Sequence, residues 1–576
     1  MATKIITILI GLTLVLIVAC GSSPAAPEPT AAPAAEPTTA PVVSDTFPPT
    51  ATPQVSAPPA DVEVNPGKLT IMVGNLGDER FDAAFSTGEG STAYGRIMGG
   101  YLMSGNEKSE IIPGIASKWK LSDDGLTWSF TIREGVKFHD GSHLTPDDVR
   151  WTLQHLFGPE ASEYAVGNTP VRLSRETEII ELSGPDKVSL TTKQPVLQLD
   201  VLVSEVGPNW HHIMPKRDKV HDTEVETAYD NKPIGAGFMK LTERVPASVM
   251  KFERFDDFYY QPENGFPEDK GVKFQSLDLF LVPEEATRVA ALRAGDADIV
   301  PASLATKQQV EAGGGRMVYG QEGVYVYVAF LGCWEPQQPC HDKRVRQAFE
   351  YAIDKELMRN QLYGPDVFET KGWNYVTPST IGYTPAMDPW PYDPDKARQL
   401  LADAGYPNGE GFGKLIVNTY PSSAMPFQVE GAQLAADFWR RELGLDVEVR
   451  VADSAGMEKM ETAGELNGQI LWRENEARKD ATSSIAAKYA DPNAEDQDRV
   501  HNDPELFRMA APAFAILDPD ERAKALETVF AKLKEESYWL SIGYANIPWG
   551  VGPRVQTWEP YPLSAYPSAF HTITLE

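Results

Sequence analysis

Three cysteines are the residues of this 576-residue chain best suited to covalent chemistry, and Cys20 has the most informative surroundings. It directly follows an uncharged run from Ile5 to Ala19, which suits a signal-peptide core better than a spanning helix of about 20 residues. A small residue precedes the cysteine, and Gly21 and Ser22 follow it, as in a lipobox, where the thiol receives diacylglycerol after cleavage. We expect residues 1–19 to be a signal peptide and Cys20 to be lipidated. A signal peptide with an incidental cysteine, or an uncleaved anchor, is the alternative.

Cys333 and Cys340 enclose a short loop, CWEPQQPC. Disulfides persist in exported proteins, so we interpret the pair as a local structural bridge. A reactive pair is the alternative.

Motifs for catalysis and cofactor binding give no further candidates. The sequence contains no GxSxG, HExxH or CxxC, and GEGFGK at Lys414 lacks the spacing and the hydroxyl residue of a phosphate-binding loop. His211 and His212 are adjacent, but neighbours on a strand point to opposite faces and no other ligands support them. We therefore expect no catalytic residues, no metal and no cofactor. The net charge of -30 argues against a nucleic-acid partner, which would need clustered Lys and Arg.

Residues 20–66 are rich in Pro, Ala and Thr and low in aromatic residues. Such a segment buries too little apolar surface to offset the entropy of ordering, and its prolines favour extended conformers. We expect a tether that holds a folded part outside the cell, at the outer face of the membrane.

The stretch from Pro113 to Val149 has a strand, a turn and a capped helix in close succession. Trp128, Phe130 and Ile132 alternate with polar residues, as in a strand with one buried face. Thr145 followed by Pro146 is typical of a helix start.

This stretch resembles the signature of the family 5 extracellular solute-binding proteins, the peptide- and nickel-type receptors of bacterial ABC importers. The matching residues are Pro113, Ala116, Trp119, Asp124, Gly125, Trp128, Phe130, Ile132, Arg133, Gly135, Val136, Phe138, Asp140, Gly141, Leu144, Thr145, Asp147 and Val149. A β-α-β run from Leu279 to Val300 and a predicted long helix from Asp342 to Leu362 resemble two further blocks of the family. Gly235 and Gly237 are interpreted as a tight turn. Other predicted elements are strands at 68–73, 188–192, 249–254, 445–451 and 538–544, and helices after Asp393, over 427–443 and after Asp518.

The resemblance implies an α/β fold of the class C periplasmic-binding-protein type, with two main lobes around a cleft and an extra lobe. The first lobe would be discontinuous, from residues 67–97, 216–325 and 537–576. The extra lobe would span residues 98–215, and the second main lobe residues 326–536.

The resemblance also suggests where the solute binds. Trp472 ends a predicted strand at the place where the family carries a tryptophan that lines the cleft. Peptide receptors follow it three residues later with an Asp that pairs with the ligand's amino terminus, but this chain has Asn475 there and Glu474 one position away. We expect Trp472, Arg473 and Glu474 to line one side of the cleft. Asn75 and Phe81, which follow the first strand, would line the other.

The implied function is a monomeric extracytoplasmic receptor that captures an oligopeptide-like solute and delivers it to an ABC permease. An oligosaccharide or a nickel complex is the alternative solute. A secreted, lipid-anchored hydrolase and an adhesive or structural lipoprotein are competing classes, and no motif supports the hydrolase.

Overall fold

The computed structural model describes residues 67–86, 91–166, 168–196, 199–207, 211–219, 221–266, 268–422, 424–482, 503–513, 516 and 518–576. The predicted signal peptide, Cys20 and the tether lie outside these residues. Within them, no helix combines the length and the apolar character needed to cross a membrane.

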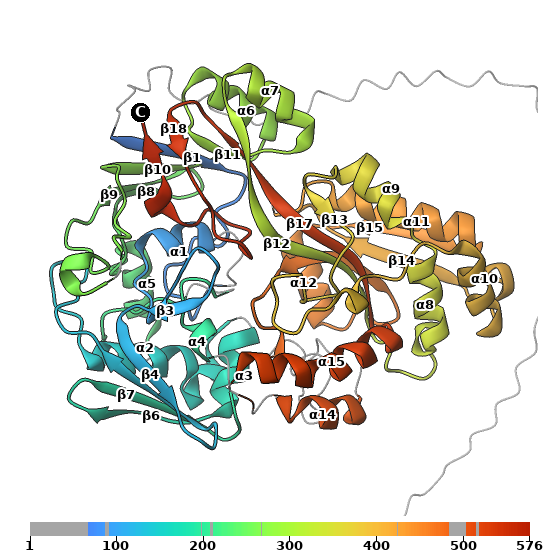
Figure 1. The fold of residues 1–576 in the computed structure, drawn as a ribbon, viewed down its shortest axis with the longest axis horizontal. Coiled ribbons are helices and arrows are strands. Elements are labelled where there is room, and N and C mark those ends of the chain that lie inside the picture. The colour runs from blue at the N-terminus through green and yellow to red at the C-terminus, as the bar shows by residue number, and fades with distance from the viewer. Residues whose placement is uncertain are drawn as a thin grey trace, which may run out of the picture. The chain divides into compact units, whose positions relative to one another are not determined.

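One mixed sheet of eleven strands is the largest feature of the described part of the chain (Figure 1). Its spatial order is β15 (Asp446–Val451), β14 (Lys414–Thr419), β16 (Ile470–Glu476), β12 (Arg316–Phe330), β17 (Trp539–Val551), β11 (Ile299–Pro301), β1 (Lys68–Val73), β10 (Ser276–Leu281), β9 (Val249–Arg254) and β8 (Met239–Val245). The short strand β13 (Phe368–Glu369) pairs with β17 beside this path.

The two long strands β12 and β17 connect the two halves of this sheet. In Figure 1 they run together from the part that holds β1, β10 and β11 to the part that holds β14 and β15. Their antiparallel register shifts between Gly320 and Val324, where one half gives way to the other. Glu322 within this bulge has a φ of 52°, and its backbone N–H donates to Asn546 Oδ1 at 2.9 Å. The crossing between the halves therefore lies in a local irregularity of two paired strands.

Both halves are built from parallel β-α-β units. In the first half, β10 and β11 flank β1 and run parallel to it, and α6 (Glu285–Ala294) connects them and ends at the left-handed Gly295. In the second half, β14 and β15 are parallel and are linked by α11 (Gln428–Leu443). This arrangement confirms the parallel sheet predicted from alternating strands and helices.

A separate four-stranded sheet contains the signature stretch. Its order is β4 (Ala116–Leu121), β5 (Thr127–Ile132), β7 (Lys187–Thr192) and β6 (Thr177–Gly184). Trp128, Phe130 and Ile132 of β5 are buried and alternate with partly exposed residues, as predicted. Helix α2 (Pro146–Phe157) starts with a reciprocal capping box between Thr145 and Asp148.

The remaining described helices are short, with one exception. They are α1 (Thr92–Met98), α3 (Asn168–Glu176), α4 (Leu199–Leu202), α5 (Thr223–Asn231), α7 (Lys307–Ala312), α8 (Lys343–Tyr351), α9 (Lys355–Leu357), α10 (Pro394–Asp403), α12 (Ser454–Thr462), α14 (Pro504–Ala510) and the long α15 (Pro519–Glu536). Two two-stranded sheets pair β2 (Met103–Gly105) with β3 (Ile111–Pro113) and β18 (Val555–Thr557) with β19 (Thr574–Leu575). The predicted strand at 249–254 and the helices that begin after Asp393 and Asp518 are confirmed.

Two predictions about local structure are wrong. The helix expected from Asp342 to Leu362 is interrupted after Tyr351, because Asp354 accepts from the Leu357 N–H and caps a new start, which continues as a π-helix over Met358–Tyr363. Gly235 and Gly237 have no left-handed φ; instead, a Cβ at either position would collide with the backbone of Met98 at the end of α1. Close packing, rather than a turn, requires these two glycines.

Candidate functional site

A cavity of about 520 Å³ lies between the two halves of the main sheet. Its first wall comes from residues at the carboxyl ends of parallel strands: Gly74 and Asn75 after β1, Pro283 after β10 and Ala302 after β11. Its second wall comes from the corresponding ends in the other half, with Ser422 after β14 and Asp453 after β15. Ile547 and Pro548 of β17 also line the cavity. Open α/β sheets bind ligands at this end of their strands, because the loops there diverge and leave a crevice.

The segment between β14 and α11 forms much of the second wall. Pro421, Ser422, Ala424 and Pro426 line the cavity, and Ser422 Oγ accepts from the Ala424 and Met425 N–H groups at 3.1 Å each. The same hydroxyl donates to Glu474 Oε1 at 2.7 Å. This hydrogen bond links the cavity wall to β16 behind it.

Glu474 has one carboxylate oxygen in use and one without a partner. Its Oε2 is buried and forms no hydrogen bond with any described residue. The Tyr363 hydroxyl nearby is also buried and unbonded, and its pKa is raised by burial and by the charges of Glu430 and Glu474. An unmet buried acceptor on an acidic side chain favours contact with a positively charged or hydrogen-bond-donating group.

Trp472 and Phe81, both predicted to line the cleft, are fully buried in this structure. Trp472 pairs with Val328 of β12 and packs toward α11, where a Cβ at Gly431 would lie 3.1 Å from its ring. The ring of Phe81 packs at a tilt against that of Tyr94, with the ring centroids 4.9 Å apart, in the same apolar core. Neither residue lines the cavity, so their contact with a solute stays a prediction.

The other predicted residues differ in their relation to the cavity. Asn75 lines it directly, with its Oδ1 accepting from the Gly77 N–H at 2.7 Å. Arg473, on the opposite face of β16 from Glu474, donates to Glu461 Oε2 at 3.0 Å. The structure thus places Asn75 on the first wall, whereas Glu474 does not line the cavity and is hydrogen-bonded to Ser422 of the second wall.

Cys333 and Cys340 are joined as a disulfide in the structure, with their Cα atoms 5.3 Å apart. Both side chains are buried, and neither residue lines the cavity.

The neighbouring His211 and His212 bond to different groups. A ring nitrogen of His211 bonds to the Leu202 carbonyl at 2.8 Å, and a ring nitrogen of His212 bonds to the Tyr229 hydroxyl at 3.1 Å. Among the described residues, no cluster of three or more His, Cys, Asp or Glu side chains could hold a metal ion.

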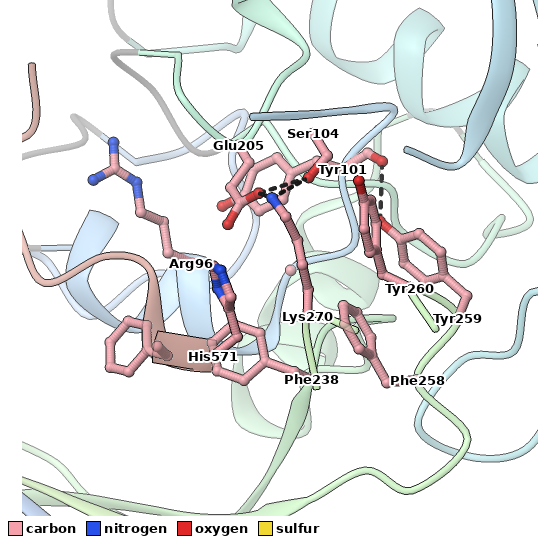
Figure 2. A pocket seen from close by; sticks show the side chains of 12 residues that line it. Arg96, Tyr101, Ser104, Glu205, Phe238, Phe258, Tyr259, Tyr260, Lys270 and His571 are labelled. Carbon is pink, nitrogen blue, oxygen red and sulfur yellow. Dashed lines mark hydrogen bonds and ion pairs between the residues drawn. The ribbon is translucent and has the colours of Figure 1, made fainter. Parts of the chain in front are cut away.

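A second, enclosed cavity holds only about 20 Å³, enough for a single water molecule. Figure 2 shows the Lys270 side chain reaching between Glu205 and Ser104. Lys270 Nζ also donates to the Tyr561 hydroxyl at 2.9 Å, so it ties three distant segments of the chain together. Burial alone would raise the pKa of Glu205, but Lys270 and Ser104 hold it below its usual value. The size and the satisfied contacts suit a structural junction rather than a solute site.

Comparison with known sequences identifies the family. The sequence model described as "Bacterial extracellular solute-binding proteins, family 5 Middle" matches residues 110–497, more than half of the chain. The chain belongs to this family. The family 5 resemblance found in the signature stretch is thereby confirmed, and so is the solute-binding class of the protein.

Similar proteins have names that refer to different solutes. Heme-binding protein A of Haemophilus influenzae is 25% identical over 486 residues, covering 81% of this chain and 85% of the relative. Glutathione-binding protein GsiB of Escherichia coli is 25% identical over 439 residues, covering 74% and 79%.

Solved structures confirm the fold. The periplasmic binding protein DppA from Helicobacter pylori, in complex with the peptide STSA, matches with a TM-score of 0.73 at 20% identity, covering 88% of this chain and 98% of that one. NikZ from Campylobacter jejuni, in complex with Ni(L-His), gives a TM-score of 0.71 at 17% identity, covering 89% and 100%. The two α/β lobes predicted from the sequence are those of this family 5 fold.

Sequence reasoning missed several residues of the cavity. Asp453 follows the predicted strand at 445–451, so its place near a strand end was open to prediction. Ser422 follows β14, a strand that the sequence analysis did not predict. Arg288 lines the cavity from the middle of α6, and its sequence context resembles an ordinary amphipathic helix. Only the packing of α6 against the strand ends reveals it.

Proposed function

We propose that this protein captures a solute in the interlobe cavity and delivers it to the permease of an ABC importer. The observation that supports this most directly is the cavity of about 520 Å³ with one wall from each half of the main sheet. Small-molecule sites typically occupy about 300–1,000 Å³. A solute that contacts both walls stabilises the closed arrangement, which is the state a permease would recognise.

The proposed lobe boundaries agree with the sheet topology. Residues 67–97, 216–325 and 537–576 contain β1 and β8 to β11, residues 326–536 contain β13 to β16, and residues 98–215 contain the four-stranded sheet. The boundary at 325 falls inside β12, whose register shift at Gly320–Val324 is the proposed hinge. Bending of β12 at this bulge would bring the two walls of the cavity closer together.

The proposed solute is an oligopeptide or a similar polar molecule. Asn75 on one wall and the Ser422–Glu474 pair behind the other supply hydrogen-bonding groups for its backbone or its ends. Similar proteins include a glutathione-binding protein and a receptor solved with a bound peptide, and these support a peptide-like ligand. An oligosaccharide or a nickel complex is the second candidate, favoured by the nickel complex bound in NikZ. Among the described residues that line the cavity there is no His or Cys that could hold a bare metal ion.

The proposal also includes attachment of the protein to the cell surface. Lipidated Cys20 would anchor a monomeric receptor to the outer face of the membrane, and residues 21–66 would serve as its tether. A secreted hydrolase is the competing class, and it predicts turnover of a bound substrate.

A thermal-shift screen tests the function. The panel contains tri-alanine and longer alanine peptides, reduced glutathione, maltotriose, heme and nickel with L-histidine. We expect at least one peptide-like member to raise Tm and to decrease the radius of gyration in solution scattering. Binding without either effect, or chemical conversion of the bound molecule, contradicts the receptor proposal.

A further inference from the structure

Arg288 is a deeply buried cation on the wall of the cavity. Its side chain lies on α6, and the residue is 7% exposed. Nη1 donates to the carbonyls of Val282 and Pro283 at 2.7 Å each, and Nε donates to the carbonyl of Pro301 at 3.4 Å. The guanidinium group thereby sits at the carboxyl ends of β10 and β11, and Gly74 at the end of β1 leaves room for it, because a Cβ there would lie 3.2 Å from Nη1.

Arg288 forms no ion pair with a carboxylate of the described residues. Its Nη2 forms no hydrogen bond with any of them. Burial lowers the pKa of the guanidinium, and the nearby charges of Glu285 and Glu284 oppose this shift only in part. A buried charge is stable when it is paired, and the planar guanidinium fork matches the two oxygens of a carboxylate.

The acidic residues of the same cavity are occupied by protein donors. Glu285 Oε1 accepts from Ser303 N–H at 2.7 Å, from Ser303 Oγ at 2.8 Å and from Thr306 Oγ1 at 2.6 Å. Asp453 Oδ1 accepts from the Gly456 N–H at 2.8 Å and caps α12. Each of these carboxylates is thus bound by protein donors through one of its oxygens, whereas the Nη2 donors of Arg288 are bound by no described residue.

We propose that Arg288 binds a carboxylate group of the solute at the first wall of the interlobe cavity. This assignment rests on the proposed receptor function and names the chemical class of its solute: a molecule with at least one free carboxylate. Asn75, two residues from β1 on the same wall, is placed to contact the part of the solute next to that group.

The first test uses acetate and needs no knowledge of the natural solute. Melting temperatures of the full chain are measured in sodium acetate, in sodium chloride of equal ionic strength, and in acetamide. Arg288→Gln is compared with Arg293→Gln, which removes an exposed arginine from the same helix. We expect acetate to raise Tm of the wild type and of R293Q above the chloride value, and to leave R288Q unchanged. Acetamide should raise none of them.

The second test uses a solute from the functional screen in two forms, such as tri-alanine and its carboxyl-terminal amide. Loss of a charge-assisted hydrogen bond should weaken binding of the amide about tenfold or more, and R288Q should bind acid and amide equally. Arg288→Lys keeps the charge without the fork and serves where R288Q fails to fold; it should bind the acid more weakly than the wild type does.

The outcomes separate the two proposals. If R288Q responds to acetate as the wild type does, the carboxylate site is wrong and the receptor function stands. If the acetate effect depends on Arg288 but no solute of the panel binds, the anion site stands and the proposed function loses its support.

Discussion

Ser422 Oγ donates a hydrogen bond to Glu474 Oε1 at 2.7 Å, and this contact joins the loop that lines the cavity to the strand behind it. The relationship gives Glu474 a defined orientation, with Oε2 buried and unpartnered. Asn475, the position at which peptide receptors carry their acidic residue, lies on the other face of β16, opposite Tyr325 of β12. The side chain of Glu474, which bonds to the cavity wall, thus lies on the opposite face of β16 from Asn475.

Glu474→Gln is predicted to weaken binding of a solute that carries a positive charge. Gln retains an acceptor for Ser422 but removes the negative charge, so affinity should fall about tenfold or more, the worth of a hydrogen bond to a charged group. Isothermal titration with the solute found in the screen measures the change. Glu430→Gln, at an exposed position on α11, is the matched control and should bind as the wild type does. Equal affinities of E474Q and E430Q would remove Glu474 from the site.

Trp472 and Trp439 offer a matched pair of fully buried tryptophans in the same core. Truncation of either to Ala should cost about 3–5 kcal/mol of unfolding free energy, because it leaves a large cavity. Trp472→Phe and Trp439→Phe, which are milder, separate stability from binding. If Trp472 contacts solute, only W472F loses affinity. The same affinity in both variants would make Trp472 a purely structural residue.

The buried contact of Lys270 with Glu205 is predicted to hold three segments together (Figure 2). Lys270→Met leaves the Glu205 carboxylate without its main partner, so the free energy of unfolding should fall by about 3 kcal/mol. Urea denaturation measures the loss. The double variant K270M/E205Q should recover part of it, because the uncompensated charge is gone. Lys273→Met, at an exposed position nearby, should change stability little, and a K270M variant as stable as K273M would contradict the predicted role.

His211 is predicted to contribute to acid destabilisation. Burial lowers its pKa from 6.5 to about 4, so the folded protein holds it neutral where the unfolded chain is already protonated. The unfolded state binds more protons between these two values, and stability therefore decreases as pH falls from about 6.5 to about 4, by on the order of 2–3 kcal/mol. His211→Asn should flatten this part of the stability–pH curve measured by urea denaturation. His143→Asn, at an exposed position, should keep the wild-type slope; equal slopes in both variants would refute the assignment.

Local sequence determined much of the secondary structure. The strand at Lys68–Val73, the alternation along β5 and the capping box of α2 depend on neighbouring residues alone, so periodicity and cap chemistry predicted them. The family could also be recognised from the sequence, because its signature depends on fixed spacings within one stretch. The break in the helix after Tyr351 could not be predicted from the sequence. Apolar residues continue at helical spacing through it, and the new N-cap at Asp354 competes with that pattern.

The site depended on tertiary structure. The sequence placed Trp472, Glu474, Asn75 and Phe81 near strand ends. Only packing decided that the two aromatic side chains are buried, and that Asn75 and Ser422, the hydrogen-bond partner of Glu474, line the cavity. Arg288 became a candidate because α6 folds back over the ends of β10 and β11 and buries its charge there. The burial of a side chain and the absence of an ion-pair partner depend on residues far apart in the chain, so no local pattern in the sequence encodes them.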